Sequence, residues 1–329
     1  MPKLPKQFKS IADAKLMRDI ESRMEHVETR ILQATSHAEK TVDTISSHLA
    51  RAGGKRLRPV LVLVTSHLGD PNREEVLDAA VVMEITHLAT LYHDDVMDQA
   101  DTRRGVDTAH TVWGNSIAIL VGDLLFARAS NIVSHLGEEA LKLQAEVFEQ
   151  LVLGQLHETI GPEDEDPLEH YIQVVRDKTG SLIALSAQLG ALLSGADSSY
   201  QEPLRLFGER IGVAFQLADD LIDIRSTAAE SGKIAGTDIL AGVPTLPVLL
   251  LENHSDEESR ALAADIASAN ETTIASVLER LRQHPVMTEA EEITQGWADD
   301  AIAALAAIPS GSVRSALEAF ARAVVDRNG

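Results

Sequence analysis

The amino-acid sequence predicts one all-α domain that spans residues 1–329, a bundle of about ten or more helices around a central cavity. Three observations predict it. Apolar residues recur every three or four positions along most of the chain, which is the spacing of one helix face. Alternating Val, Ile and Thr, the pattern of half-buried strands, is almost absent, and alanine is abundant, above all after residue 259. No linker is long enough to divide the chain into two domains.

The expected helices follow one another between short breaks. Residues 11–51 carry an amphipathic pattern, with Ile20, Met24, Val27 and Ile31 on one apolar face, and are expected to form one or two helices. The acidic segment 162–170 is expected to be a solvated loop that leads into a helix. Gly and Pro mark the predicted breaks. These lie at 53–54, 69–72, 105, 161–162, 195, 232–242 and 309–311.

Composition narrows the function. There are 29 Lys and Arg against 51 Asp and Glu, a formal net charge of −22, whereas nucleic-acid binding needs clustered surplus cations. We therefore expect no nucleic-acid partner. The absence of cysteine excludes disulfides, thiolate nucleophiles and sulfur-ligated zinc, and it suits a cytoplasmic location. The first residues lack the apolar core of a signal peptide, and no run reaches about 18 apolar residues. We expect no transmembrane segment, and at most a peripheral membrane association for product release.

Two segments place acidic residues inside otherwise apolar helices with the same D-D-x-x-D spacing. They supply Asp94, Asp95 and Asp98 in the first set, and Asp219, Asp220 and Asp223 in the second. At about 100° per residue, each set projects two or three carboxylates from one side of its helix, and Gln216 falls within the arc of the second. Two such charges about 4 Å apart repel by about 4 kcal/mol at an effective dielectric constant of about 20. The sets therefore need cations, and oxygen-only ligands favour Mg²⁺, with Mn²⁺ as a substitute.

One D-D-x-x-D alone is more often a solvated helix face than a metal site. The bare pair Asp299-Asp300 shows how readily two acids occur together on a surface helix. Two intact copies, each flanked by apolar residues, favour the metal site instead. Two carboxylate rows held apart are suited to clamp a diphosphate through bridging Mg²⁺.

The scarce cations gather beside glycines. Residues 51–59 concentrate Arg51, Lys55, Arg56 and Arg58 around a Gly-Gly turn. Further cations of this kind are Arg103, Arg104, Lys178 and Lys233. Glycine lets the backbone approach a phosphate, and Lys or Arg supplies charge-assisted hydrogen bonds. His87 lies seven residues before Asp94, within about 20° of the same helix face, so a ligand contact and a core position are both open for it. His93 lies off that face and is expected to be structural.

An ordered set of motifs between residues 53 and 247 resembles those of the trans-isoprenyl diphosphate synthases, or polyprenyl synthetases. The motifs are GGKRLRP, H-x6-DDVMD-x4-RRG, KTG, FQLADDLID and GK-x2-G-x-D-x3-G-x-x-TLP. The resemblance implies the isoprenoid synthase fold, a homodimer and Mg²⁺-dependent elongation. In that reaction isopentenyl diphosphate condenses head-to-tail with an allylic diphosphate, and pyrophosphate leaves.

Matched position by position, the resemblance also implies roles for the site residues. The main Mg²⁺ ligands would be Asp94, Asp98 and Asp219, supported directly or through water by Asp95, Asp220 and Asp223. The diphosphate of isopentenyl diphosphate would be held by Gly54, Lys55, Arg58, His87 and Arg104. The allylic diphosphate would be held by Arg103, Lys178 and Lys233. Thr179 and Gln216 would lie beside the ionising carbon and, with Lys178, form the catalytic set.

Product length in this family is limited by bulky residues just before the first Asp set. Here Ala89, Thr90 and Thr86 stand there, and short-chain synthases carry aromatic residues at the first two of these positions. The resemblance therefore implies an open tunnel between helices and an all-trans product of about six to ten isoprene units, about C30–C50. Met83 or Val82, deeper in the helix, would cap growth sooner and give a geranylgeranyl-type product.

Other readings are open at this stage. A non-catalytic subunit of a heteromeric synthase should have lost some of the aspartates or the arginine pair, which this chain retains. A terpene cyclase also uses Asp-rich helices but does not explain GGKRLRP and His87. Val243 stands where the family commonly has Lys, which puts one contact to the allylic diphosphate in doubt.

Overall fold

The computed structural model describes residues 13–225, 236–243 and 245–326. These ranges are helical almost throughout, and the predicted all-α class is confirmed. The amino-terminal half contains α1 (Ala14–Thr35), α2 (Lys40–Ser46), α3 (His48–Arg51), α4 (Leu57–Ser66), α5 (Glu74–Met97), β1 (Thr102–Arg103), β2 (Val106–Asp107), α6 (Ala109–Trp113), α7 (Asn115–Val133) and α8 (Glu138–Ile160). There follow α9 (Pro167–Val175), the π-helix η2 (Arg176–Gly180), α10 (Ser181–Leu193), η3 (Ser198–Tyr200) and α11 (Gln201–Arg225). The remaining elements are α13 (Thr237–Ala241), α14 (Leu246–Asn253), α15 (Glu257–Ala267), α16 (Ile274–Gln283), α17 (Val286–Ala304), η4 (Leu305–Ala307) and α18 (Ser312–Val325).

The segment 11–51, which was expected to form one or two helices, forms three. α1 begins where the Asp13 side chain accepts hydrogen bonds from the backbone N–H groups of Lys15 and Leu16, at 2.9 and 3.1 Å. Its predicted apolar face is buried in the core. The chain then adds α2 and α3 before the break at 53–54. The breaks at 114 and 137, where Gly has positive φ, were not among those predicted.

Two short strands depart from the predicted helical pattern. β1 and β2 pair antiparallel, with Arg103 opposite Val106. Between them, Arg104 and Gly105 have φ of 55° and 79°. Positive φ at both central residues is typical of a type I′ hairpin turn, which Gly readily adopts. The break predicted at Gly105 is therefore a hairpin, and it fixes the directions of two adjacent arginines.

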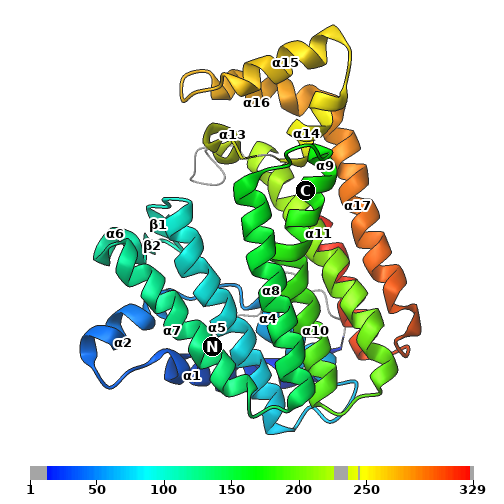
Figure 1. Cartoon of the computed structure of the whole chain (residues 1–329). Coiled ribbons are helices and arrows are strands. Elements are labelled where there is room, and N and C mark those ends of the chain that lie inside the picture. Colours follow the sequence, from blue (N-terminus) through cyan, green and yellow to red (C-terminus); the bar gives the residue numbers. More distant parts are fainter. Residues whose placement is uncertain (1–12, 226–235, 244, 327–329) are drawn as a thin grey trace.

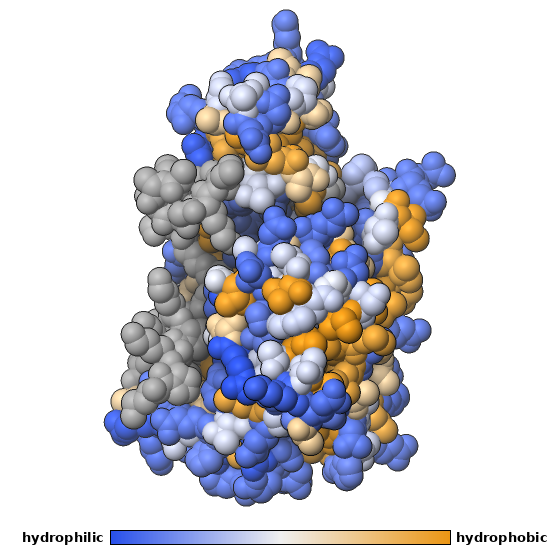
Figure 2. Space-filling view, turned by 90° about the vertical axis from the view of Figure 1, so that its left-hand side faces the viewer, coloured by the Kyte–Doolittle hydropathy of each residue, from blue (hydrophilic) through white to orange (hydrophobic). Residues whose placement is uncertain are grey.

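The outer face of α6, α7 and α8 is unusually apolar for an exposed surface. Figure 2 shows hydrophobic side chains across the centre and right of the side of the molecule that carries α6 and α7. By length and composition, α7 is the one described helix that could cross a membrane, and a third of its apolar window is buried. Its packing against α5 is the most extensive between any two described elements, which makes it a helix of this bundle.

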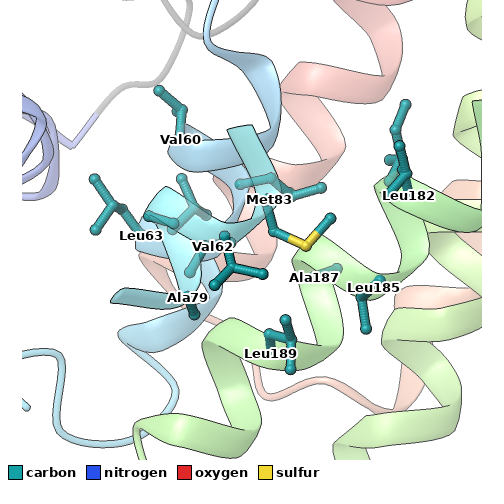
Figure 3. Close-up of a cluster of buried hydrophobic side chains, with 14 of the residues drawn as sticks. Val60, Val62, Leu63, Ala79, Met83, Leu182, Leu185, Ala187 and Leu189 are labelled. Atoms are coloured by element: carbon teal, nitrogen blue, oxygen red, sulfur yellow. The ribbon is translucent and has the colours of Figure 1, made fainter. Parts of the chain in front are cut away.

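The interior beneath the two Asp sets is built from α4, α5 and α10 (Figure 3). Val62 of α4 and Met83 of α5 interleave with Leu185 and Ala187 of α10, and all four are buried. Burying a side chain such as Val, Leu or Met contributes about 1.5–3 kcal/mol. Met83 fills the space between α5 and α10.

α11 joins two parts of the interior. Its first half packs in the main core, and its second half packs in a smaller cluster with α13–α17. Figure 1 shows α5 and α11 running toward the same end of the bundle, where α5 reaches the β1–β2 hairpin and α11 lies beneath α13. The last two turns of these helices, with the C-cap residue Asp98 of α5, carry the two Asp sets. The topology therefore brings the sets to one end of the molecule.

Candidate active site

The first Asp set divides between two environments. Asp95 is buried and accepts a 2.7 Å hydrogen bond from Arg103 Nε, while its Oδ2 finds no partner among the described residues. Asp94 is half-buried, and burial raises its pKa to about 6. The positive charge of Lys178 opposes that rise, and the negative charge of Asp98 adds to it. The negative charges of Asp94 and Asp98 therefore repel one another. A bound metal ion would relieve this repulsion, as expected for the predicted ligands.

The second Asp set divides in the same way. Asp220 is buried and accepts hydrogen bonds from the Tyr171 hydroxyl, the Leu246 backbone N–H at 3.0 Å and the Gln216 amide at 3.4 Å. Burial raises the pKa of Asp220 to about 7, although these hydrogen bonds oppose the rise. The middle aspartate of each set thus faces the protein. Asp220 also ties the start of α14 to α11.

Asp219 and Asp223 are half-buried and share their surroundings with a third carboxylate, Asp238 of α13. Burial raises the pKa of Asp238, and the negative charges of Asp223 and Asp219 raise it further. The backbone N–H of Asp238 donates to Asp223 Oδ2 at 3.3 Å. Crowded carboxylates of this kind attract a cation.

A pocket of cations lies beside α5. Arg58 and His87 are partly buried, and Arg58 Nε has no hydrogen-bond partner among the described residues. Burial lowers the pKa of Arg58 to about 10, and the charge of Arg104 adds to that effect. Burial also lowers the pKa of His87 well below its usual value, helped by Arg58 and Arg104. Burial and mutual repulsion disfavour the positive charges of this pocket, and a bound anion would offset both effects.

The Gly-Gly turn shapes this pocket. Gly54 has φ of 151°, and a Cβ at this position would lie 2.7 Å from Cζ of Arg104. Only glycine therefore lets the guanidinium of Arg104 lie against the turn. Arg104 Nη1 donates to the carbonyls of Leu49, at 3.2 Å, and Gly53. Lys55 is exposed on the same turn, with its Nζ 5.7 Å from the centre of the Phe215 ring.

η2 positions Lys178 and Thr179. A π-helical turn inserts one extra residue per turn and is often found at functional sites. It is packed tightly against α11, since a Cβ on Gly212 would lie 2.5 Å from Cα of Gly180. Lys178 Nζ forms an ion pair with Glu158 of α8, and both charges influence Asp94. Lys178 therefore lies next to the first Asp set.

The remaining predicted residues have varied surroundings. Ala89 and Thr86 are buried, and Thr86 Oγ1 has no hydrogen-bond partner in the described ranges. Thr90, one turn before Asp94, is half-buried and donates to the carbonyl of His87 at 2.8 Å. Lys233 lies outside the described residues.

The predicted structural role of His93 agrees with its contacts. Its Nε2 lies 3.0 Å from the Ile119 carbonyl of α7 and 3.4 Å from an Asp123 carboxylate oxygen. A Cβ on Gly122 would lie 2.2 Å from the same Nε2 atom. His93 therefore fills the α5–α7 contact, away from the cation pocket.

The donors at both Asp sets suit a hard divalent ion. In the described ranges no three Asp, Glu or His side chains lie close enough to hold an ion by themselves. Mg²⁺ usually keeps several waters and binds one or two carboxylates together with substrate phosphates. The half-buried Asp94, Asp219 and Asp223 and the exposed Asp98, with an Asp95 oxygen that has no partner among the described residues, fit that kind of partial coordination.

Comparison with known proteins decides the family. Residues 39–283 match the family model described as Polyprenyl synthetase. The chain belongs to this family. Nonaprenyl diphosphate synthase from Mycobacterium tuberculosis is 40% identical over 323 residues, which cover 97% of this chain and 96% of that protein. Component 2 of heptaprenyl diphosphate synthase from Geobacillus stearothermophilus is 34% identical and covers 90% of this chain and 92% of its own. This polyprenyl synthetase is therefore a trans-prenyl diphosphate synthase, a prenyltransferase.

A solved structure extends the similarity to the fold. Geranylgeranyl pyrophosphate synthase from Corynebacterium glutamicum, complexed with calcium and isoprenyl diphosphate, superposes with a TM-score of 0.87 and 42% identity. The match covers 97% of this polyprenyl synthetase and 99% of that chain. Its metal agrees with the use of divalent ions in the family.

Several residues of the site were not singled out from the sequence. They are Glu28, Glu84, Glu158, Tyr171 and Asp238. Two of them carried a readable signal. Glu84 is the lone charge in the apolar run AAVVMEITHLATLY, and Asp238 is the only acid of the late motif. Glu158 and Tyr171 carried none, because only the fold brings α8 and α9 to the Asp sets.

Proposed function

We propose that this polyprenyl synthetase catalyses the Mg²⁺-dependent head-to-tail condensation of isopentenyl diphosphate with an allylic diphosphate, and that its product is an all-trans chain of about C30–C50. The observation that carries the proposal is the neighbourhood of α5. The end of this helix presents the half-buried Asp94 and, at its C-cap, the exposed Asp98, and the same helix contributes His87 to the cation pocket. One helix therefore serves two anionic groups.

The cation pocket is suited to the diphosphate of isopentenyl diphosphate. Arg58 has a buried Nε–H without a partner among the described residues, and Arg104 is held against the Gly-Gly turn. Lys55 is exposed at the edge of the pocket and can close over a bound anion. His87, with its lowered pKa, is neutral near pH 7 and can donate one hydrogen bond without adding charge.

The allylic diphosphate is assigned to the Asp sets. Asp94, Asp98 and Asp219 would hold Mg²⁺, which neutralises charge on the pyrophosphate as the allylic C–O bond breaks. Arg103 is held by Asp95, and Lys178 lies beside Asp94, so both cations can stabilise the leaving group. Charge that develops only in the transition state is then met by groups already in place.

Neutral dipoles suit the carbon that becomes positive. Thr179 lies directly after Lys178 in η2, and Gln216 lies one helical turn before Asp220 and donates to it. Their oxygens can stabilise an allyl cation without the reactivity of a free carboxylate. Because Gln216 uses its amide N–H for Asp220, its carbonyl oxygen is left to face the site.

Small residues support the long product, and one buried residue supports the runner-up. Ala89, Thr90 and Thr86 offer little bulk below the first Asp set, as expected for an elongating chain. Met83, however, is fully buried between α5 and α10 (Figure 3), where it would stop the growth of the product at a shorter length. Similar proteins include both a nonaprenyl and a geranylgeranyl synthase. A geranylgeranyl-type product is therefore the second candidate.

A homodimer is part of the proposal. Of thirteen exposed large hydrophobic side chains in the described structure, ten lie on α6–α8. The most exposed are Leu120, Leu156 and Ile160. Exposed apolar patches of this kind mark protein–protein interfaces. A second copy that packs on this face would also account for the apolar composition of α7. The face supports association with a second chain, and we take that chain to be another copy; the component name of the Geobacillus relative keeps a heteromer as the alternative.

The decisive experiment measures elongation by the purified chain alone. Labelled isopentenyl diphosphate, an allylic primer and Mg²⁺ are supplied, and the products are separated by length. Asp94→Ala and Asp219→Ala should each abolish turnover with an unchanged circular dichroism spectrum. Asp299→Ala, at an exposed position of α17 outside the site, is the matched control and should retain full activity. If the chain alone elongates no primer, the proposal is wrong and the heteromeric alternative is favoured.

A further inference from the structure

A buried carboxylate that has no role in the proposed chemistry lies at the centre of the cation pocket. Glu84 is 2% exposed and lies on α5, three residues before His87. Residues three apart on a helix project from the same side. A lone buried carboxylate would be very costly, so its partners indicate what it does.

Two arginines from different parts of the chain share Glu84 Oε1. Arg56 Nη1 donates to it at 2.6 Å, and Arg104 Nη2 lies 3.5 Å from it. Arg56 comes from the turn before α4, and Arg104 comes from the β1–β2 hairpin, 48 residues later. The charge of Glu84 also acts on Arg58, whose pKa would otherwise fall further through burial. One carboxylate therefore contacts two guanidinium groups and acts on a third through its charge.

Both arginines that contact Glu84 also donate hydrogen bonds to backbone carbonyls in and before the Gly-Gly turn. Arg56 donates to the carbonyls of Ala50, at 3.1 Å, and Gly53, at 3.3 Å. Arg104 donates to the carbonyl of the same Gly53 and to that of Leu49. The end of α3 and the turn after it are thus held by guanidinium groups that converge on one carboxylate. Arg56 is itself in a left-handed conformation, with φ of 51°, which such contacts must stabilise.

We propose that Glu84 is a positioning residue for isopentenyl diphosphate: it holds Arg104 and the Gly53-Gly54 turn in the geometry that binds that diphosphate. The inference rests on the proposed function, since it assigns the pocket to that substrate. Arg56 is then part of the support and does not contact the substrate, because its guanidinium is occupied by Glu84 and Glu28.

A positioning role and a purely electrostatic role of Glu84 predict opposite effects of its removal on the binding of isopentenyl diphosphate. Glu84 places a negative charge next to a pocket for an anion, so removing that charge should strengthen diphosphate binding if charge alone matters. If Glu84 acts by holding Arg104, its removal should weaken binding, because the arginines repel one another and leave the turn. The allylic site lies outside this network, so its binding should change little in either case.

The test is steady-state kinetics of Glu84→Gln with both substrates varied. Loss of one charge-assisted hydrogen bond to Arg104 should raise the KM for isopentenyl diphosphate about tenfold or more. The KM for the allylic primer should stay within about twofold. Glu74→Gln is the matched control: it removes an ion-paired carboxylate from the first turn of the same helix, where its partner is Arg30 and not an arginine of this network, and its kinetics should stay near wild type.

A second variant keeps the proposal testable if the first one does not fold. Arg56→Met combined with Glu84→Gln removes both charges of the buried pair, leaves Arg104 without its anchor and should show the same rise in KM. An unchanged or lower KM for isopentenyl diphosphate in either folded variant overturns the inference. Equal rises in both KM values also overturn it, because they indicate general damage. A wild-type enzyme that fails to elongate would instead refute the proposed function.

Discussion

The hydrogen bond from Tyr171 to Asp220 gives a prediction that can be worked through quantitatively. The Tyr171 hydroxyl donates to a carboxylate that is 3% exposed, and it is one of three donors to that group. Tyr171→Phe removes this donor and leaves the ring to fill the same space. A hydrogen bond to a charged group contributes about 1.5–3 kcal/mol.

The same hydrogen bond should appear in the pKa of Asp220. Burial raises that pKa to about 7, and the Tyr171 hydroxyl opposes the rise because it stabilises the ionised form. One pKa unit corresponds to about 1.36 kcal/mol, so losing the donor should raise the pKa by about one to two further units. A carboxyl whose folded pKa exceeds its unfolded value loses stabilisation as pH rises. The variant should therefore be destabilised more at high pH than at low pH.

Urea unfolding with a chelator present measures this effect. The free-energy difference between wild type and Tyr171→Phe should be small at about pH 5, where Asp220 is protonated in both, and should grow toward about 1.5–3 kcal/mol by about pH 9. Asp220→Asn is the control background, because the substitution there should cost the same at both pH values. A cost that does not change with pH in the wild-type background would refute an ionised Asp220 held by Tyr171.

Four other perturbations test separate parts of the site. Gly54→Ala should raise the KM for isopentenyl diphosphate by about tenfold or more, since its Cβ displaces Arg104 from the turn, and a normal KM would refute the close approach. Because burial raises the pKa of Asp94 to about 6, the Mg²⁺ concentration for half-maximal activity should rise as pH falls below about 6; a constant requirement between about pH 5 and 8 would contradict this. Ala89→Phe should shorten the products seen by chromatography, and unchanged lengths would mean that the tunnel passes elsewhere. Leu120→Glu should turn a dimer into a monomer in light scattering, and an unchanged mass would place the interface on another face.

Sequence reasoning succeeded where the signal is local and periodic. The helix over residues 14–35 follows from its apolar spacing, and the D-D-x-x-D sets lie on helices as their flanks predict, except that Asp98 is the C-cap residue of α5. The family follows from ordered motifs. These features depend on residues within one or two helical turns of each other, which a linear pattern can represent.

Long-range features escaped the same reasoning for a physical reason. The ion pair of Glu84 with Arg56 joins residues 28 apart, and the Tyr171–Asp220 hydrogen bond joins residues 49 apart. Nothing in spacing tells which buried charge will meet which partner. The hairpin at 102–107 escaped because strands of two residues are too short to show alternation. The different surroundings of Asp94 and Asp95 also required the fold, since adjacent helix positions differ by only about 100°.

The type I′ hairpin has a consequence for the geometry of the reaction. Arg103 and Arg104 are consecutive, and their Cα atoms are therefore about 3.8 Å apart. Arg103 is paired with Asp95, and Arg104 is bonded to the Gly-Gly turn. The distance between the proposed sites for the two diphosphates therefore depends on one pair of consecutive residues. The turn sets the separation between the diphosphate groups of the two substrates. Inserting one glycine into the turn should lower kcat strongly and change either KM little. Each substrate would still bind, but their reacting carbons would no longer meet.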